Sequence, residues 1–264
     1  MGVVCGHIDI DSKPLRIYWP DPVSPSLYSV EFIGHPEASQ FDDLTFMRML
    51  YSEFVKSGDL VFNVGANVGT RTQVFVDLGA NVVAVEPQAA MCDALREKFG
   101  EKVAVVEAVA GAEEGEGELW LCTDNQLATC AKGWAESLKD RWPMEKWHKK
   151  ITVPMVTLDG LIAQYGEPDF CKIDVEGYEI EVLKGLTHPL KALCFEYTVP
   201  FIEPALECVD YLAALGMTRF NYIVQETMRF LLPEWVGPEL IKRVLADLPS
   251  ETFYGDVFAW RAEE

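Results

Sequence analysis

The segment from Asp59 to Thr70 constrains the fold of this chain more than any other. It reads DLVFNVGANVGT, a buried-type strand that runs directly into a glycine turn at the start of a helix. Beyond it, apolar strands alternate with amphipathic helices, which predicts an α/β fold with a mostly parallel sheet and helices on both faces. We expect strands at 60–64, 82–85, 103–106, 170–173, 192–195, 220–224 and 257–260, and helices near 70–78, 88–99, 178–184 and 203–215.

Two parts of the chain depart from this alternation. Residues 1–57 contain proline-rich turns and then a helical stretch around Phe46 to Phe54, which predicts a cap segment packed on a main domain of residues 58–264. A second departure, at about 122–150, contains Trp134, Trp142 and Trp147. Long inserts in compact domains are usually functional or disordered. The tryptophans favour an ordered insert, which is either a lid over the substrate or a packing element.

Acidic residues outnumber basic ones by 42 to 22, which gives a formal net charge of −20. This balance argues against nucleic acid and anionic membranes as partners and favours a neutral or cationic substrate. No apolar run approaches the roughly 18 residues of a membrane span. Seven cysteines without a CxxC pair indicate free thiols in a reducing compartment, so we expect a cytoplasmic protein. The oligomeric state stays open.

The glycine turn predicts a cofactor site. Gly65 and Gly69 allow the backbone to approach a ligand closely, and Glu86 follows the next strand about 20 residues later, where a carboxylate accepts the ribose hydroxyls of an adenosine. A dinucleotide site requires the pattern GxGxxG, but Asn67 and Thr70 occupy its second and third glycine positions. The loop therefore suits the amino-acid end of S-adenosylmethionine better than a diphosphate.

Polar residues stand at the ends of five predicted strands. Ligands of open α/β sheets bind outside the carboxyl ends of the strands, so we expect these side chains to face one crevice. They are Asn63, Glu86, Glu107, Asp174 and Glu196.

Four blocks of the sequence together resemble the FkbM-type S-adenosylmethionine-dependent methyltransferases. They are NVGANVG at 63–69, VEP at 85–87, TLD at 157–159, and KIDVEGYE at 172–179 with VLKG after it, within residues 58–200. The resemblance implies a class I methyltransferase fold, a Rossmann-like sheet of seven strands whose last strand is antiparallel. The chain departs from the family at Asn63, where the family usually has aspartate.

The resemblance also implies which residues contact the cofactor. Gly65, Ala66, Asn67 and Gly69 would line its loop, with Asn63 and Thr72 beside it. Glu86 would hold the ribose, with Pro87 next to it, Glu107 and Ala108 would lie near adenine, and Asp174 would border the methionine part.

The family mostly methylates hydroxyls of sugars, glycans and natural products, so the resemblance implies a small-molecule or glycan-like acceptor and S-adenosylhomocysteine as a product. Methyl transfer is an in-line displacement, which depends chiefly on placement of the acceptor oxygen, and a base assists loss of its proton. Our candidate bases are Asp174 or Glu176, then Glu196, then His148 of the insert.

Three alternatives remain at this stage. The carboxylates Asp174, Glu176 and Glu196 could instead hold a divalent metal, which we do not favour because no Asp-Asn pair follows the fifth strand. An NAD(P)-dependent oxidoreductase lacks both the glycines and a Tyr-x-x-x-Lys pair. A non-catalytic protein that only binds cofactor would fit the change at Asn63.

Overall fold

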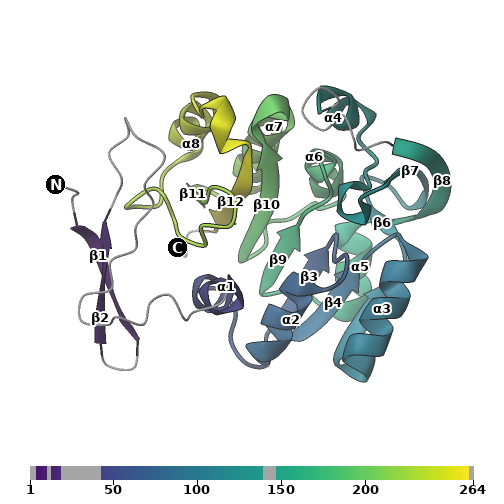
Figure 1. Ribbon diagram of the computed structural model, residues 1–264, viewed down its shortest axis with the longest axis horizontal. Coiled ribbons are helices and arrows are strands. Elements are labelled where there is room, and N and C mark those ends of the chain that lie inside the picture. The colour runs from purple at the N-terminus through teal and green to yellow at the C-terminus, as the bar shows by residue number, and fades with distance from the viewer. Residues whose placement is uncertain (1–3, 11–12, 19–42, 139–146, 262–264) are drawn as a thin grey trace. The chain divides into compact units, whose positions relative to one another are not determined.

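The computed structural model describes residues 4–10, 13–18, 43–138 and 147–261 (Figure 1). The chain divides into two compact units, Met1–Phe46 and Met47–Glu264. The first contains an antiparallel hairpin of β1 (Val4–Ile10) and β2 (Lys13–Tyr18), and helix α1 (Asp43–Tyr51) crosses the division. The cap packed on the core, with a boundary near residue 57, stays a prediction.

The second unit is built on a seven-stranded sheet with the order β11-β12-β10-β9-β3-β4-β5. Neighbouring strands from β10 to β5 pair in parallel, whereas β12 is antiparallel to both β10 and β11. The predicted α/β sheet with an antiparallel last strand is therefore confirmed. The strands are β3 (Leu60–Val64), β4 (Asn81–Val85), β5 (Val103–Val106), β9 (Phe170–Ile173), β10 (Ala192–Thr198), β11 (Arg219–Tyr222) and β12 (Tyr254–Trp260).

Helices cover both faces of this sheet. On one face, apolar residues of β3, β4, β9 and β10 share a core with α5 (Leu158–Tyr165), α6 (Glu179–Lys184), α7 (Glu203–Leu215) and α8 (Pro238–Ala246). On the other face, Tyr51 contacts the rings of Phe75, Phe170 and Phe258. Phe75 belongs to α2 (Thr70–Asp77), and α3 (Ala89–Phe99) packs beside β5. The predicted helix at 203–215 is confirmed, and Gly216 ends it with φ 102°.

A second, three-stranded sheet has the order β6-β8-β7 and lies outside our predicted strands. It comprises β6 (Val109–Ala110), β7 (Gly115–Cys122) and β8 (Trp147–Val156). Between β7 and β8 the insert forms the short helix η3 (Asn125–Leu127) and α4 (Lys132–Ser137) (Figure 1). Trp142 lies outside the described residues. The described part of the insert is thus ordered secondary structure.

Three short 3-10 helices complete the described elements: η2 (Gly100–Lys102), η4 (Val199–Phe201) and η5 (Ser250–Thr252). Within the described ranges, every helix is too short or too polar to cross a membrane.

Candidate active site

Two cavities of about 120 and 390 Å³ open where the carboxyl ends of the parallel strands meet. Both are lined by Gly65 and Asn67 of the loop between β3 and α2, and by Asp174 after β9. Glu86 after β4 borders only the smaller cavity, and Glu196 of β10 only the larger one. The cavities therefore lie at the edge of the sheet where the rule for open α/β sheets expects a ligand.

Gly65 makes the tight turn after β3 possible. Its φ of 83° is left-handed, and a Cβ atom there would lie 1.7 Å from the backbone oxygen of Asp174. The Asp174 N–H donates to the Val64 carbonyl at 2.9 Å, so the loop and the end of β9 are joined directly. Only glycine fits this position. Ala66, also predicted, borders the larger cavity, whereas Gly69 is a left-handed residue against α3, where a Cβ would lie 2.7 Å from Leu95.

Glu86 is buried at the end of β4, with 3% of its surface exposed. Its carboxylate accepts the Asn67 N–H and the Gln88 N–H, both at 2.9 Å, so it fixes the glycine loop as well as facing the smaller cavity. Burial raises the pKa of Glu86, and these hydrogen bonds oppose that shift. Pro87 and Ala108 line the same cavity.

Four of the predicted cofactor residues, Gly69 among them, lie outside the walls of the two cavities. Asn63 and Thr72 are buried behind the loop, where the Asn63 amide donates to the Thr72 hydroxyl at 2.9 Å. Glu107 turns outward and forms an ion pair with Arg96 of α3 at 3.1 Å. A contact between Glu107 and adenine stays a prediction.

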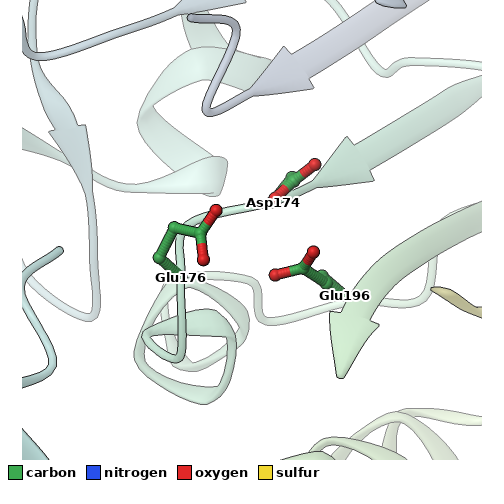
Figure 2. Close-up of side chains that lie close together, drawn as sticks. All are labelled: Asp174, Glu176 and Glu196. Carbon is green, nitrogen blue, oxygen red and sulfur yellow. The ribbon is translucent and has the colours of Figure 1, made fainter. Parts of the chain in front are cut away.

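Asp174, Glu176 and Glu196 converge on the larger cavity. Each offers a carboxylate oxygen within 4.8 Å of the other two, and Figure 2 shows the three side chains pointing toward one another from the end of β9, the turn after it and β10. Glu176 takes a left-handed φ of 57° in that turn. The carboxylates thus form one acidic cluster, which we call the carboxylate triad.

The surroundings of Glu176 and Glu196 favour the protonated form of each side chain. Loss of solvent contact raises the pKa of Glu176 and Glu196 well above the usual value, and the neighbouring carboxylates raise it further. Asp174 instead has a cation beside it, the Lys172 ammonium at 3.1 Å. The carboxylate triad can accept hydrogen bonds from hydroxyl groups and take up a proton, and its oxygens are also of the type that binds divalent cations.

The insert supplies a wall of both cavities. Asn125, Ala128, Thr129 and Cys130 line the smaller one, and Leu127 and Trp134 line the larger one. Trp134 donates from Nε1 to the Thr198 hydroxyl at 3.0 Å, and Thr129 donates to the Glu176 carbonyl at 2.6 Å. His148 is exposed on β8 and does not line either cavity. The described insert therefore packs against the turn that carries Glu176.

A further part of the wall of the larger cavity was absent from our sequence-based prediction. Arg71 Nη2 of α2 donates to both carboxylate oxygens of Glu226, at 2.7 and 2.8 Å. Both residues line the larger cavity, together with Phe253 and Tyr254. Arg71 and Glu226 are separated by 155 residues. Tyr254 begins β12, ahead of the strand predicted at 257–260, so the sequence pattern did not point to this wall.

The sheet order with an antiparallel β12, and a cavity bordered by the glycine loop and Glu86, define a class I methyltransferase fold. The sequence model of one family, described as the methyltransferase FkbM domain, matches residues 63–222. The chain belongs to this family, which confirms the resemblance of its motifs.

A curated relative with a named activity is the hexuronic acid methyltransferase AglP of Haloferax volcanii, 27% identical over 152 residues. The match covers 56% of this chain and 58% of the relative, so it spans little more than half of that protein.

Among solved structures, a TehB-like S-adenosylmethionine-dependent methyltransferase from Corynebacterium glutamicum has a TM-score of 0.45 and 9% identity, covering 86% of this chain and 92% of that one. An O-methyltransferase from Bacillus cereus in complex with S-adenosylhomocysteine has a TM-score of 0.42 and 14% identity, covering 85% and 84% of the two chains. Structural similarity at this level does not indicate which reaction this chain catalyses.

The residues of the smaller cavity fit the cofactor of this family. Glu86 offers carboxylate oxygens for ribose hydroxyls. Behind the loop, Asn63 Oδ1 is a buried acceptor with no hydrogen-bond partner among the described residues. An unpaired buried acceptor costs free energy until a donor reaches it. Asn63 lines neither cavity, so a hydrogen bond from the cofactor's ammonium group to Asn63 stays a prediction. Asparagine therefore retains an acceptor at the position where the family usually has aspartate.

Proposed function

We propose that this protein transfers a methyl group from S-adenosylmethionine to a hydroxyl group of a sugar, glycan or natural-product acceptor. The observation that carries this proposal is the junction of the two cavities at Gly65, Asn67 and Asp174. Cofactor in the smaller cavity and acceptor in the larger one would meet there. S-adenosylhomocysteine is then the product that remains in the smaller cavity.

The acceptor site combines carboxylates with aromatic rings. The carboxylate triad forms one side, and Trp134, Phe253 and Tyr254 contribute large side chains to the lining. Carboxylate oxygens accept hydrogen bonds from several hydroxyl groups at once, which suits a polyhydroxylated ring. Holding the acceptor oxygen in line with the bond between sulfur and the methyl group supplies most of the rate enhancement.

A carboxylate of the triad takes the proton of the acceptor hydroxyl in this proposal. Asp174, Glu176 and Glu196 are the candidates, and the burial that raises the pKa of the two glutamates makes them stronger bases once they are ionised. The methyl group leaves the sulfonium, the acceptor oxygen gains it, and the proton passes to the carboxylate. No metal is required for this balance, and we do not propose one.

The charges around the larger cavity favour a neutral or amine-bearing acceptor. Among the described residues, Arg71 is the one cation that lines it, and Glu226 already pairs with that guanidinium. Asp124 adds a further carboxylate to the carboxylate triad. An anionic acceptor would meet an unfavourable field there. We therefore propose an acceptor that differs in charge from the hexuronic acid named for the relative AglP.

Methyl transfer to a panel of glycosides tests this proposal. S-adenosylmethionine with a ¹³C-labelled methyl group is incubated with the protein and the methyl glycosides of glucose, glucosamine or glucuronic acid, and new methyl ethers or esters are detected by NMR. We expect methyl ethers on the neutral or amino sugar. Esterification of the glucuronide alone would refute the charge argument, and labelling of none in the presence of bound cofactor would refute a simple sugar as acceptor.

A cytoplasmic location is also part of the proposal. The six cysteines with described side chains are all free thiols, which suits a reducing compartment.

A further inference from the structure

Lys172 is a fully buried cation directly beneath the candidate active site. It lies on β9, only 1% of its side chain is exposed, and its ammonium is 3.1 Å from Asp174 Oδ2 and 3.0 Å from Asp256 Oδ1. Burial alone would lower the pKa of Lys172, but the two carboxylates outweigh it and raise the pKa. A buried charge is costly unless it is paired, so this lysine depends on both partners.

The sheet register places the second partner below the carboxylate triad. Asp256 on β12 lies opposite Glu196 on β10, and Cys194 of β10 lies opposite Lys172 on β9. Asp256 is buried, with 5% of its surface exposed, and it lines neither cavity. Lys172 and Asp256 thus link the strands that carry Asp174 and Glu196 without lining the acceptor cavity.

The carboxylate triad needs a fixed geometry that its own charges oppose. When ionised, three carboxylates within 4.8 Å of one another repel, and side chains free to rotate would turn apart. Lys172 attracts one of the three from behind. The hydrogen bond from the lysine to Asp256 fixes the ammonium in turn.

We propose that Lys172 is a positioning residue for methyl transfer. It fixes the Asp174 carboxylate in its place beside Glu176 and Glu196, and Asp256 in turn fixes the Lys172 ammonium. This inference rests on the proposed function, since it assigns Lys172 to the same acceptor site. Lys172 touches neither cavity, so its effect passes through Asp174. A lysine with a purely structural role would stabilise the sheet without setting the rate of transfer.

Kinetics of Lys172→Met, Lys172→Arg and Asp256→Asn test the proposal. Each variant is assayed with the glycoside that the unmodified protein methylates fastest in the panel above. We expect Lys172→Met to lower kcat by about 10- to 100-fold, on the order of the loss of an aligned base, with KM and the cofactor Kd changed by no more than about threefold. Lys172→Arg keeps the cation and should recover part of kcat.

A matched control separates this effect from the loss of any ion pair. Lys191 pairs with Asp169 at 3.5 Å on the surface, and Lys191→Met should leave kcat and KM unchanged. Should Lys172→Met fail to fold, Asp256→Asn carries the test, with a smaller loss of kcat. A kcat within about twofold of that of the unmodified protein, in each of these two variants that folds, would overturn the proposal.

A crystal structure of Lys172→Met gives a readout that needs no turnover. We expect the Asp174 carboxylate to rotate away from Glu176 and Glu196, and an unchanged Asp174 conformation would contradict the positioning role. If the unmodified protein binds no S-adenosylmethionine, the proposed function fails, but the crystallographic test of Lys172 keeps its meaning.

Discussion

Replacing Gly65 by alanine tests the geometry of the cofactor loop. The added Cβ would lie 1.7 Å from the Asp174 carbonyl oxygen, whereas real Cβ contacts are not shorter than 3.0 Å, so the loop or the end of β9 must shift by at least about 1.3 Å. The left-handed φ of 83° adds about 1–2 kcal/mol of strain for a residue with a side chain. Overpacking against rigid backbone adds about 1–3 kcal/mol more.

Gly216→Ala is the matched control for this strain. Gly216 also has a left-handed φ, of 102°, but no atom lies within 4 Å of an added Cβ. Urea unfolding should show a loss of about 1–2 kcal/mol for Gly216→Ala and about 2–5 kcal/mol for Gly65→Ala. The difference between the two variants measures the clash with Asp174.

Cofactor binding separates the two glycine variants further. A shift of the loop would move its backbone relative to the cofactor, so Gly65→Ala should weaken S-adenosylhomocysteine binding in a calorimetric titration. Gly216→Ala should leave binding unchanged. Equal stability losses in the two variants, with unchanged binding by Gly65→Ala, would refute the close approach of the loop to Asp174.

Three further predictions concern the acidic groups. At saturating cofactor, at least one of Asp174→Asn, Glu176→Gln and Glu196→Gln should lower turnover by about 100-fold, whereas His148→Ala should not. Four unaltered rates would exclude a base in this set. Burial raises the pKa of Glu179 to about 7, so the folded chain keeps a proton that the unfolded chain loses. The contribution of Glu179 to stability should therefore fall as the pH rises from about 4.5 to 7 and then level off. Glu179→Gln should reduce this slope in urea unfolding at several pH values, and an unchanged slope would contradict the shift. Turnover should be unaffected by a chelator; a loss that magnesium restores would assign the carboxylate triad to a metal.

The main sheet could be predicted because its strands are buried on both faces. A strand such as β3 then reads as a short continuous apolar run, and the glycine after it marks its end. The second sheet escaped prediction for the opposite reason. In β7 and β8, exposed charged residues such as Glu116, Glu118 and Lys149 interrupt the apolar positions, and the partner strands lie far apart in sequence.

The rule that ligands bind at the carboxyl ends of strands predicted some residues of the candidate site but not others. Asp174 and Glu196 were among the residues predicted to share one crevice because parallel strands end at the same edge, and Glu176 was a candidate base close to Asp174 in the sequence. The structure brings these three carboxylates together. The rule could not give the direction of a side chain, and Glu107 turned toward Arg96 instead. Nor could local patterns reveal Arg71 and Glu226, whose pairing depends on the folded chain.

The most direct test of the central claim is a calorimetric titration with S-adenosylmethionine, S-adenosylhomocysteine and NAD, repeated with Glu86→Ala. We predict micromolar binding of the two sulfur compounds and none of NAD. Glu86→Ala removes hydrogen bonds from a charged acceptor, each worth about 1.5–3 kcal/mol, so two of them correspond to a loss of about 100-fold or more in affinity. Binding of NAD without the sulfur compounds, or sulfur-compound binding that survives Glu86→Ala unchanged, would contradict the proposed cofactor site.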